Sequence, residues 1–154
     1  HKGKVEHAVV VDPIRQEEFV ASRGQGATLN GKRIRVSSLE SFDGALIATG
    51  GRDRHLHLAG ETAIQQQLLE SKSFTRQSGS AALDLAYIAA GRLDGLYLRG
   101  LERWNMAAGV LLVTEAGGLV GDFEGGASFM KTGNVVAGSP KCFKQLSSVV
   151  RKLL

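Results

Sequence analysis

The stretch GSAALDLAYIAAG, residues 79–91, is apolar at nearly every position and carries a single charge, at Asp84. A helix that is apolar around its whole circumference is typical of one buried inside a larger body, so we predict a buried helix here. Ser80 is expected to cap its start, because a hydroxyl there accepts from one of the first unpaired N–H groups. Gly91 is expected to end it, because glycine adopts the left-handed conformation at little cost.

A second helix pattern follows a short strand pattern and begins near WNMAAG, residues 104–109. Asn105 is expected to cap this helix, and Gly117 in the sequence EAGG is expected to end it. The two helix starts, near Gly79 and Asn105, each present unpaired N–H groups and the positive end of a helix dipole. Such ends attract anions, phosphate among them.

The remaining pattern changes once along the chain. Residues 1–36 predict three antiparallel strands, at 4–11, 17–23 and 32–36. From residue 44 onward strand and helix patterns alternate, which predicts an α/β unit over 44–154. Its further expected elements are strands at 45–49, 73–76, 95–98, 119–123 and 134–137 and helices at 61–70 and 140–154. The fold class is therefore α/β, with antiparallel strands followed by a mixed α/β sheet in one domain.

The loop RGQGA, residues 23–27, superficially resembles a dinucleotide-binding loop. That motif needs a third glycine and a helix start behind it, because the N–H groups of the helix start hold the pyrophosphate. Here the third glycine is missing and another strand pattern follows. We therefore set a dinucleotide site aside.

The composition is that of one mildly basic domain. The 154 residues carry 19 Lys and Arg against 15 Asp and Glu, a net charge of +4, and the basic residues are scattered apart from KRIR at 32–35. We interpret that run as a charged strand edge that discourages pairing with other strands. The single cysteine cannot form an internal disulfide, which favours a reducing cytoplasm. No apolar run approaches the length of a membrane span, so no membrane contact is expected.

Few side chains form a recognisable catalytic or metal-binding cluster. Asp122 and Glu124 lie on one face of an extended strand and are a candidate carboxylate pair, although we favour a solvated strand end. His55 and His57 would be a partial zinc site in an extended segment, but no third ligand is evident and we favour a polar loop. Cys142 has no base tied to it and is interpreted as a packing residue.

Several segments, in this order, resemble the C-terminal portion of the inositol monophosphatase family. They are RGQGA at 23–27, NG at 30–31, GSAALDLA at 79–86, GRLDG at 91–95, WN and AAG within 104–109, EAGG at 115–118 and VAG at 136–138. The resemblance spans essentially the whole chain. Within the family it is most similar to bacterial SuhB-type, or extragenic suppressor, members, notably in DPIRQEEF at 12–19 and TGN at 132–134.

The resemblance implies a layered αβαβα fold, a homodimer, and a Mg²⁺-dependent phosphatase acting on inositol monophosphate or a similar sugar phosphate. It implies substrate contacts at Gly79, Ser80 and Ala81 and a dimer contact at Arg76. The family's Glu-Glu pair and its Asp-Pro-Leu-Asp-Gly-Thr segment, which supply most metal ligands, lie upstream of His1. We therefore expect this chain to be a fragment of a longer protein, to be inactive alone, and not to bind Mg²⁺ by itself.

Two departures fall on positions that are functional in the family. The family's remaining metal ligand is the Asp of a Trp-Asp pair, and this sequence has Trp104-Asn105. Seven residues earlier the family commonly has a Glu that binds inositol hydroxyls, and this sequence has Leu98. The family's Gly-Phe-Pro segment is also changed, to GGR at 50–52, so the loop there is expected to differ in shape.

These features leave two hypotheses of different classes. In the first, the longer protein hydrolyses inositol monophosphate with Mg²⁺ in the cytoplasm. In the second, it is a largely non-catalytic SuhB-type protein that acts through protein contacts in transcription antitermination complexes, as the resemblance implies. The upstream sequence discriminates between them, because an intact Asp-Pro-Leu-Asp-Gly-Thr segment favours the enzyme and a degraded one favours the binding protein.

Overall fold

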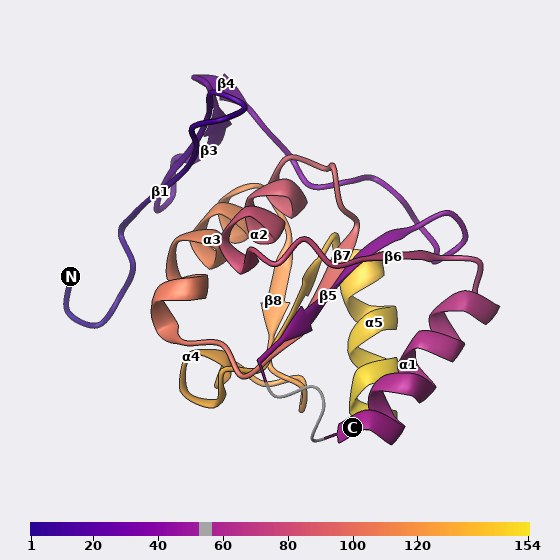
Figure 1. Ribbon diagram of the computed structural model, residues 1–154. Coiled ribbons are helices and arrows are strands. Elements are labelled where there is room, and N and C mark those ends of the chain that lie inside the picture. The colour runs from indigo at the N-terminus through magenta and orange to yellow at the C-terminus, as the bar shows by residue number, and fades with distance from the viewer. Residues whose placement is uncertain (53–56) are drawn as a thin grey trace.

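Four layers of secondary structure make up the computed structural model, which describes residues 1–52 and 57–154. An antiparallel sheet is followed by a pair of helices, a mixed sheet and a second pair of helices (Figure 1). Apolar side chains fill the spaces on both sides of the mixed sheet in two clusters. The expected order, antiparallel strands followed by a mixed α/β sheet, is confirmed.

The antiparallel sheet contains four strands in chain order: β1 (His7–Asp12), β2 (Glu17–Ser22), β3 (Gly26–Leu29) and β4 (Lys32–Arg33). The expectation of three strands is wrong because the short strand β3 fits between the glycine loop and the Asn30-Gly31 turn. Both turn residues have positive φ, as a tight hairpin turn requires. The strand expected at 32–36 is correspondingly shorter, because its pairing with β3 ends at Arg33.

The mixed sheet has the strand order β6-β5-β7-β9-β8. Its strands are β5 (Leu46–Gly51), β6 (Phe74–Arg76), β7 (Gly95–Arg99), β8 (Leu119–Gly121) and β9 (Val135–Gly138). β5 runs parallel to β6 and β7, whereas β9 runs antiparallel to β7 and β8. Leu96 and Leu98 of β7 face one helix pair and Tyr97 faces the other. The central strand is therefore buried on both faces, as its apolar sequence requires.

The first helix pair, α2 (Ala81–Ala89) and α3 (Arg103–Glu115), lies between the two sheets (Figure 1). Most of α2 is buried, as predicted. Ser80 caps its start by accepting a hydrogen bond from the Leu83 N–H, and Gly91 beyond its end has a φ of 68°. The two helices pack closely at Gly109, where an added Cβ atom would lie 2.4 Å from the Leu85 Cβ. A side chain at position 109 would therefore force the helices apart.

Asn105 does not cap α3, contrary to the expectation. Glu102 occupies the cap position, and Asn105 lies three residues further on, inside the first turn. The Asn105 Oδ1 accepts a hydrogen bond from the Glu102 N–H at 3.0 Å. An acceptor at this position supports the helix start from inside the first turn, as in a capping box. The expected end of α3 is confirmed by Gly117, which has a φ of 90°.

The second helix pair, α1 (Leu58–Glu70) and α5 (Pro140–Leu153), covers the far face of the mixed sheet (Figure 1). Ile64 and Leu68 of α1 and Leu146 of α5 are fully buried there. The one-turn helix α4 (Phe129–Thr132) is absent from the prediction, because four residues are too few to show a helical period. Over the described ranges, none of the helices has both the length and the hydrophobicity needed to cross a membrane.

The glycine loop of the first sheet docks on the end of α3 through one carboxylate. The two oxygens of Glu115 accept hydrogen bonds from the Gly24 and Gly26 N–H groups, each at 2.8 Å. Both glycines have positive φ, a backbone form that gathers N–H groups around an anion. These bonds, first that of Gly24, lower the pKa of the Glu115 carboxyl. The loop that resembles a dinucleotide loop therefore binds a carboxylate of the protein itself.

We predict that Glu115→Gln destabilises the protein by roughly 1–3 kcal/mol at neutral pH, because a neutral amide replaces a charged acceptor of two hydrogen bonds. Since the folded pKa of Glu115 is lowered, its contribution is present above the ordinary pKa of 4.5 and is lost as the pH falls through the folded value. Thermal unfolding of the two proteins should differ at neutral pH and converge in acid. Equal stabilities at neutral pH would contradict the role assigned to this carboxylate.

Candidate functional site

A cavity of about 260 Å³ lies where β5 and β7 end and α2 and α3 begin. Gly79, Ser80 and Ala81 line it at the start of α2. Asn105 lines it from the first turn of α3, and Leu98 from β7. The packing of these elements thus gathers around one cavity the positions that the sequence analysis selected in three separate segments.

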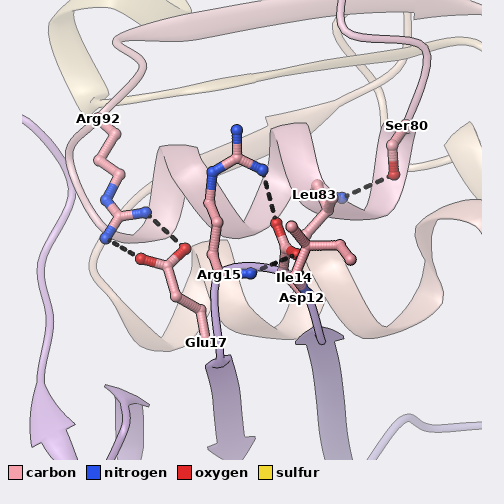
Figure 2. A network of polar contacts seen from close by, with 7 residues as sticks. All are labelled: Asp12, Ile14, Arg15, Glu17, Ser80, Leu83 and Arg92. Atoms are coloured by element: carbon pink, nitrogen blue, oxygen red, sulfur yellow. Dashed lines mark hydrogen bonds and ion pairs between the residues drawn. The ribbon is translucent and has the colours of Figure 1, made fainter.

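The start of α2 presents N–H groups at this cavity. The amide of Ala81, at the first helical position, has no acceptor inside the helix, and the helix dipole adds positive potential there. The Ser80 hydroxyl is turned to the Leu83 N–H, at 3.4 Å (Figure 2). Gly79 has a φ of 86°, and an added Cβ atom would meet nothing within 4 Å. Backbone conformation, rather than lack of space, therefore requires glycine at this turn.

Two charged side chains of opposite sign line the cavity, those of Arg52 and Asp84. The Arg52 Nη1 lies 3.5 Å from a carboxylate oxygen of Glu102, which does not line the cavity, and the side chains of this ion pair are accessible to solvent. Asp84, in the first turn of α2, is only 2% exposed. Burial raises the pKa of the Asp84 carboxyl, although a hydrogen bond from Ser78 acts in the opposite direction. The cavity therefore has an exposed cation on its wall and an acid whose ionised form is disfavoured by burial.

The described residues do not by themselves fit a magnesium ion. Within residues 1–52 and 57–154, no group of three or more His, Cys, Asp or Glu side chains could hold a metal ion. Asn105 is neutral, and its side-chain oxygen already accepts the Glu102 N–H. Mg²⁺ prefers carboxylate and water oxygens, so a magnesium ion at this cavity would need carboxylates from outside the described residues.

Asp122 and Glu124 are neither a carboxylate pair on one strand face nor a solvated strand end. β8 ends at Gly121, and the Asp122 side chain is buried in the loop that follows. Its Oδ1 accepts the N–H groups of Glu124 and Gly126 at 3.0 and 2.7 Å, and its Oδ2 accepts that of Ser128 at 2.9 Å. The carboxylate therefore organises this loop and is not directed at a metal.

The remaining candidates for chemistry that the structure describes, His57 and Cys142, do not line the cavity. The partial zinc site involves His55, which falls outside the described residues, and His57, which immediately precedes α1. Cys142 is buried in α5 against Gly95, where an added Cβ atom would lie 2.7 Å from the sulfur. Burial raises the pKa of the Cys142 thiol to about 12. A thiol that stays protonated at neutral pH is not a nucleophile, which agrees with the packing interpretation.

Arg76 lies on β6, at an edge of the mixed sheet, and does not itself line the cavity, although the next residue, Gln77, does. It lines a second hollow of about 190 Å³ together with Arg15 and Arg92. Figure 2 shows that Arg92 binds Glu17 through two hydrogen bonds, of 2.6 and 2.8 Å, and that Arg15 binds Asp12 at 2.9 Å. The Arg92 bonds lower the pKa of the Glu17 carboxyl. The sequence analysis missed this pair because its members lie 75 positions apart.

The four layers and the position of the cavity define a class of protein. It is an α/β protein in which an antiparallel and a mixed sheet share one helix pair, with a cavity at the strand ends. Over residues 1–153 the chain matches the inositol monophosphatase family, and it belongs to that family. The family resemblance drawn from the sequence is thus confirmed.

Similar curated proteins carry the name Nus factor SuhB. The protein of Pseudomonas aeruginosa is 51% identical over 154 residues, which cover 98% of this chain and 57% of that protein. The protein of Escherichia coli strain K12 is 50% identical over 151 residues, which cover 97% of this chain and 57% of that protein. The similarity to SuhB-type members is confirmed by these identities.

Solved structures agree with the fold. The extragenic suppressor protein suhB from Bartonella henselae has a TM-score of 0.94 at 39% identity, covering 99% of this chain and 59% of that one. Inositol monophosphatase from Anabaena (Nostoc) sp. PCC 7120 has a TM-score of 0.91 at 34% identity, covering 99% of this chain and 64% of that one. The chain thus spans less than two thirds of the length of each of these relatives.

Proposed function

We propose that this chain is the phosphate-binding portion of a longer Mg²⁺-dependent phosphatase that acts on inositol monophosphate or a similar sugar phosphate. The observation that carries the proposal is the cavity at the start of α2, which Gly79, Ser80, Ala81 and Asn105 line together. These four residues are the ones that the family resemblance assigns to substrate and metal. We further propose that the longer protein is a cytoplasmic homodimer with Arg76 near the contact.

The chemistry of the cavity suits a phosphate group. Helix N–H groups and the positive end of a helix dipole bind anions without a cationic side chain, and glycine at the turn lets the ligand approach the backbone closely. The volume of about 260 Å³ is just below the range of roughly 300–1,000 Å³ typical of drug-sized ligands. A compact sugar phosphate therefore fits this cavity better than a dinucleotide does.

Mg²⁺ would supply charge stabilisation and an activated water, and the carboxylates that hold it would come from outside the described residues. The role proposed for this chain is to bind and orient the phosphate. The chain alone should therefore lack turnover even where its fold is intact.

We predict that the chain alone releases no phosphate from inositol 1-phosphate above the blank at millimolar Mg²⁺, whereas the longer protein does. The reason is the lack of a metal-binding cluster in the described residues. A colorimetric phosphate assay on both proteins, with chelated longer protein as the control, is the measurement. Absence of turnover in the longer protein would contradict the phosphatase proposal, and turnover by the chain alone would contradict the need for outside carboxylates.

We predict that Asn105→Asp in the longer protein tightens Mg²⁺ binding about tenfold, because a carboxylate brings a full charge where the amide offers one carbonyl oxygen. Stability without metal should barely change, since an aspartate in the first turn can still accept the Glu102 N–H and interacts favourably with the helix dipole. Calorimetric Mg²⁺ titration and metal-free thermal melts provide the two measurements.

Asn134→Asp is the matched control for this variant. Its side-chain oxygen also accepts a backbone N–H, that of Gly100 at 3.2 Å, but the residue does not line the cavity. The control adds the same charge and should leave Mg²⁺ affinity unchanged. Equal tightening by both variants would indicate a general charge effect, and no tightening by Asn105→Asp would mean that Asn105 does not occupy a ligand position.

Two positions at the cavity favour the alternative function, because Leu98 and Asn105 are neutral where the family resemblance implies acids. The relatives of 51% and 50% sequence identity also carry the name Nus factor SuhB. In this alternative the longer protein is non-catalytic and acts through protein contacts in transcription antitermination. This function would be supported over the phosphatase if the longer protein bound transcription proteins but neither released phosphate from inositol 1-phosphate nor bound inorganic phosphate.

A further inference from the structure

Two hydrogen bonds link the turn before α2 to the first turn of that helix. The Ser78 Oγ donates to the Asp84 Oδ1 at 2.7 Å, and the Ser80 N–H donates to the Ser78 Oγ at 3.2 Å. The Ser78 hydroxyl thus connects the Asp84 side chain to the backbone of Ser80, across Gly79. The connection spans the turn whose amides line the cavity.

The acid in this arrangement requires an explanation. Asp84 is 2% exposed, and within the described ranges no cation lies within ion-pair distance of it, although the charge of Arg76 acts on it from further away. A buried carboxylate in this position is costly unless its oxygens are hydrogen-bonded. A carboxylate on the wall would also repel a phosphate if it served only as a charge. The contact with Ser78 suggests a different role, which is to set the direction of a hydroxyl.

The Ser78 O–H is the donor and the Asp84 oxygen the acceptor, and this bond favours the ionised carboxylate against the effect of burial on its pKa. The lone pairs of the Ser78 oxygen are then free to accept the Ser80 N–H. This bond occupies the Ser80 N–H and holds residues 78 and 80 together across Gly79, which has a positive φ. The N–H group of Ala81, which lines the cavity, is left to face a ligand.

We propose that Asp84 and Ser78 are positioning residues that hold the phosphate-binding turn in its binding conformation without themselves contacting the phosphate. The inference rests on the proposed function, because it concerns the same cavity. Without this pair the turn must be ordered when the ligand binds, and that ordering weakens binding. The chemical step depends on groups elsewhere and should be spared. The loss should therefore appear in KM and in phosphate affinity, and not in kcat.

The test uses the longer protein with Mg²⁺, and its readouts are KM and kcat for inositol 1-phosphate and the Kd of inorganic phosphate by calorimetry. Ser78→Ala removes both hydrogen bonds of the Ser78 hydroxyl and should raise KM and Kd about tenfold, with kcat changed less than about twofold. Ser78→Thr keeps the hydroxyl and should restore most of the affinity. Ser71→Ala is the matched control, since the Ser71 hydroxyl also bonds a nearby backbone group, the Gln67 carbonyl, but lies away from the cavity.

Asp84→Asn separates the hydrogen bond from the charge. The amide oxygen can still accept the Ser78 O–H, so we expect phosphate affinity to change less than about threefold. Asp84→Leu removes the acceptor and should match Ser78→Ala. Tighter phosphate binding by Asp84→Asn would show that repulsion by the charge dominates, which would overturn the positioning role.

The two levels of the proposal fail in different ways. If unmodified longer protein neither hydrolyses inositol 1-phosphate nor binds inorganic phosphate, the proposed function fails and the positioning role falls with it. If the unmodified protein does both while Ser78→Ala and Asp84→Leu leave KM and Kd unchanged, the proposed function stands and only the positioning role is overturned.

Discussion

The burial of α2 on two sides is the constraint on which the rest of the structure depends. A helix that is apolar around its circumference must be covered by more than one layer, and here the antiparallel sheet and the mixed sheet cover it together with α3. The close contact at Gly109 sets the spacing of the helix pair, and the Glu115 carboxylate docks the first sheet on that pair. The start of α2, which emerges at the strand ends, is the part left open to a ligand.

Local signals in the sequence were sufficient for much of this fold. The cap at Ser80 and the positive φ at Gly91 depend on a few neighbouring residues, and both are confirmed. Short elements were missed, because a four-residue strand such as β3 or a single turn such as α4 shows no clear period. Residue types favour Asn105 as the cap over Glu102, which occupies that position in the structure, because Glu is a less common cap than Asn.

The site shows the same division between local and distant effects. The glycine turn at residue 79 and the anion-attracting helix start could be read from neighbouring residues, whereas the cavity depends on β5, β7 and α3 meeting α2. The partners of Asp122 are backbone N–H groups of a loop, and those of Glu115 lie about ninety positions away. Residue types alone do not indicate such partners, so carboxylates that serve structure are easily mistaken for candidates for chemistry.

The central claim is that the start of α2 binds the phosphate. The most direct measurement is a crystal structure of the longer protein grown with Mg²⁺ and inorganic phosphate. The account predicts a phosphate in this cavity, within hydrogen-bonding distance of backbone N–H groups between Gly79 and Ala82, with the Ser78 hydroxyl still turned toward Asp84. A phosphate bound at another place, or none in this cavity when the metal is present, would contradict it.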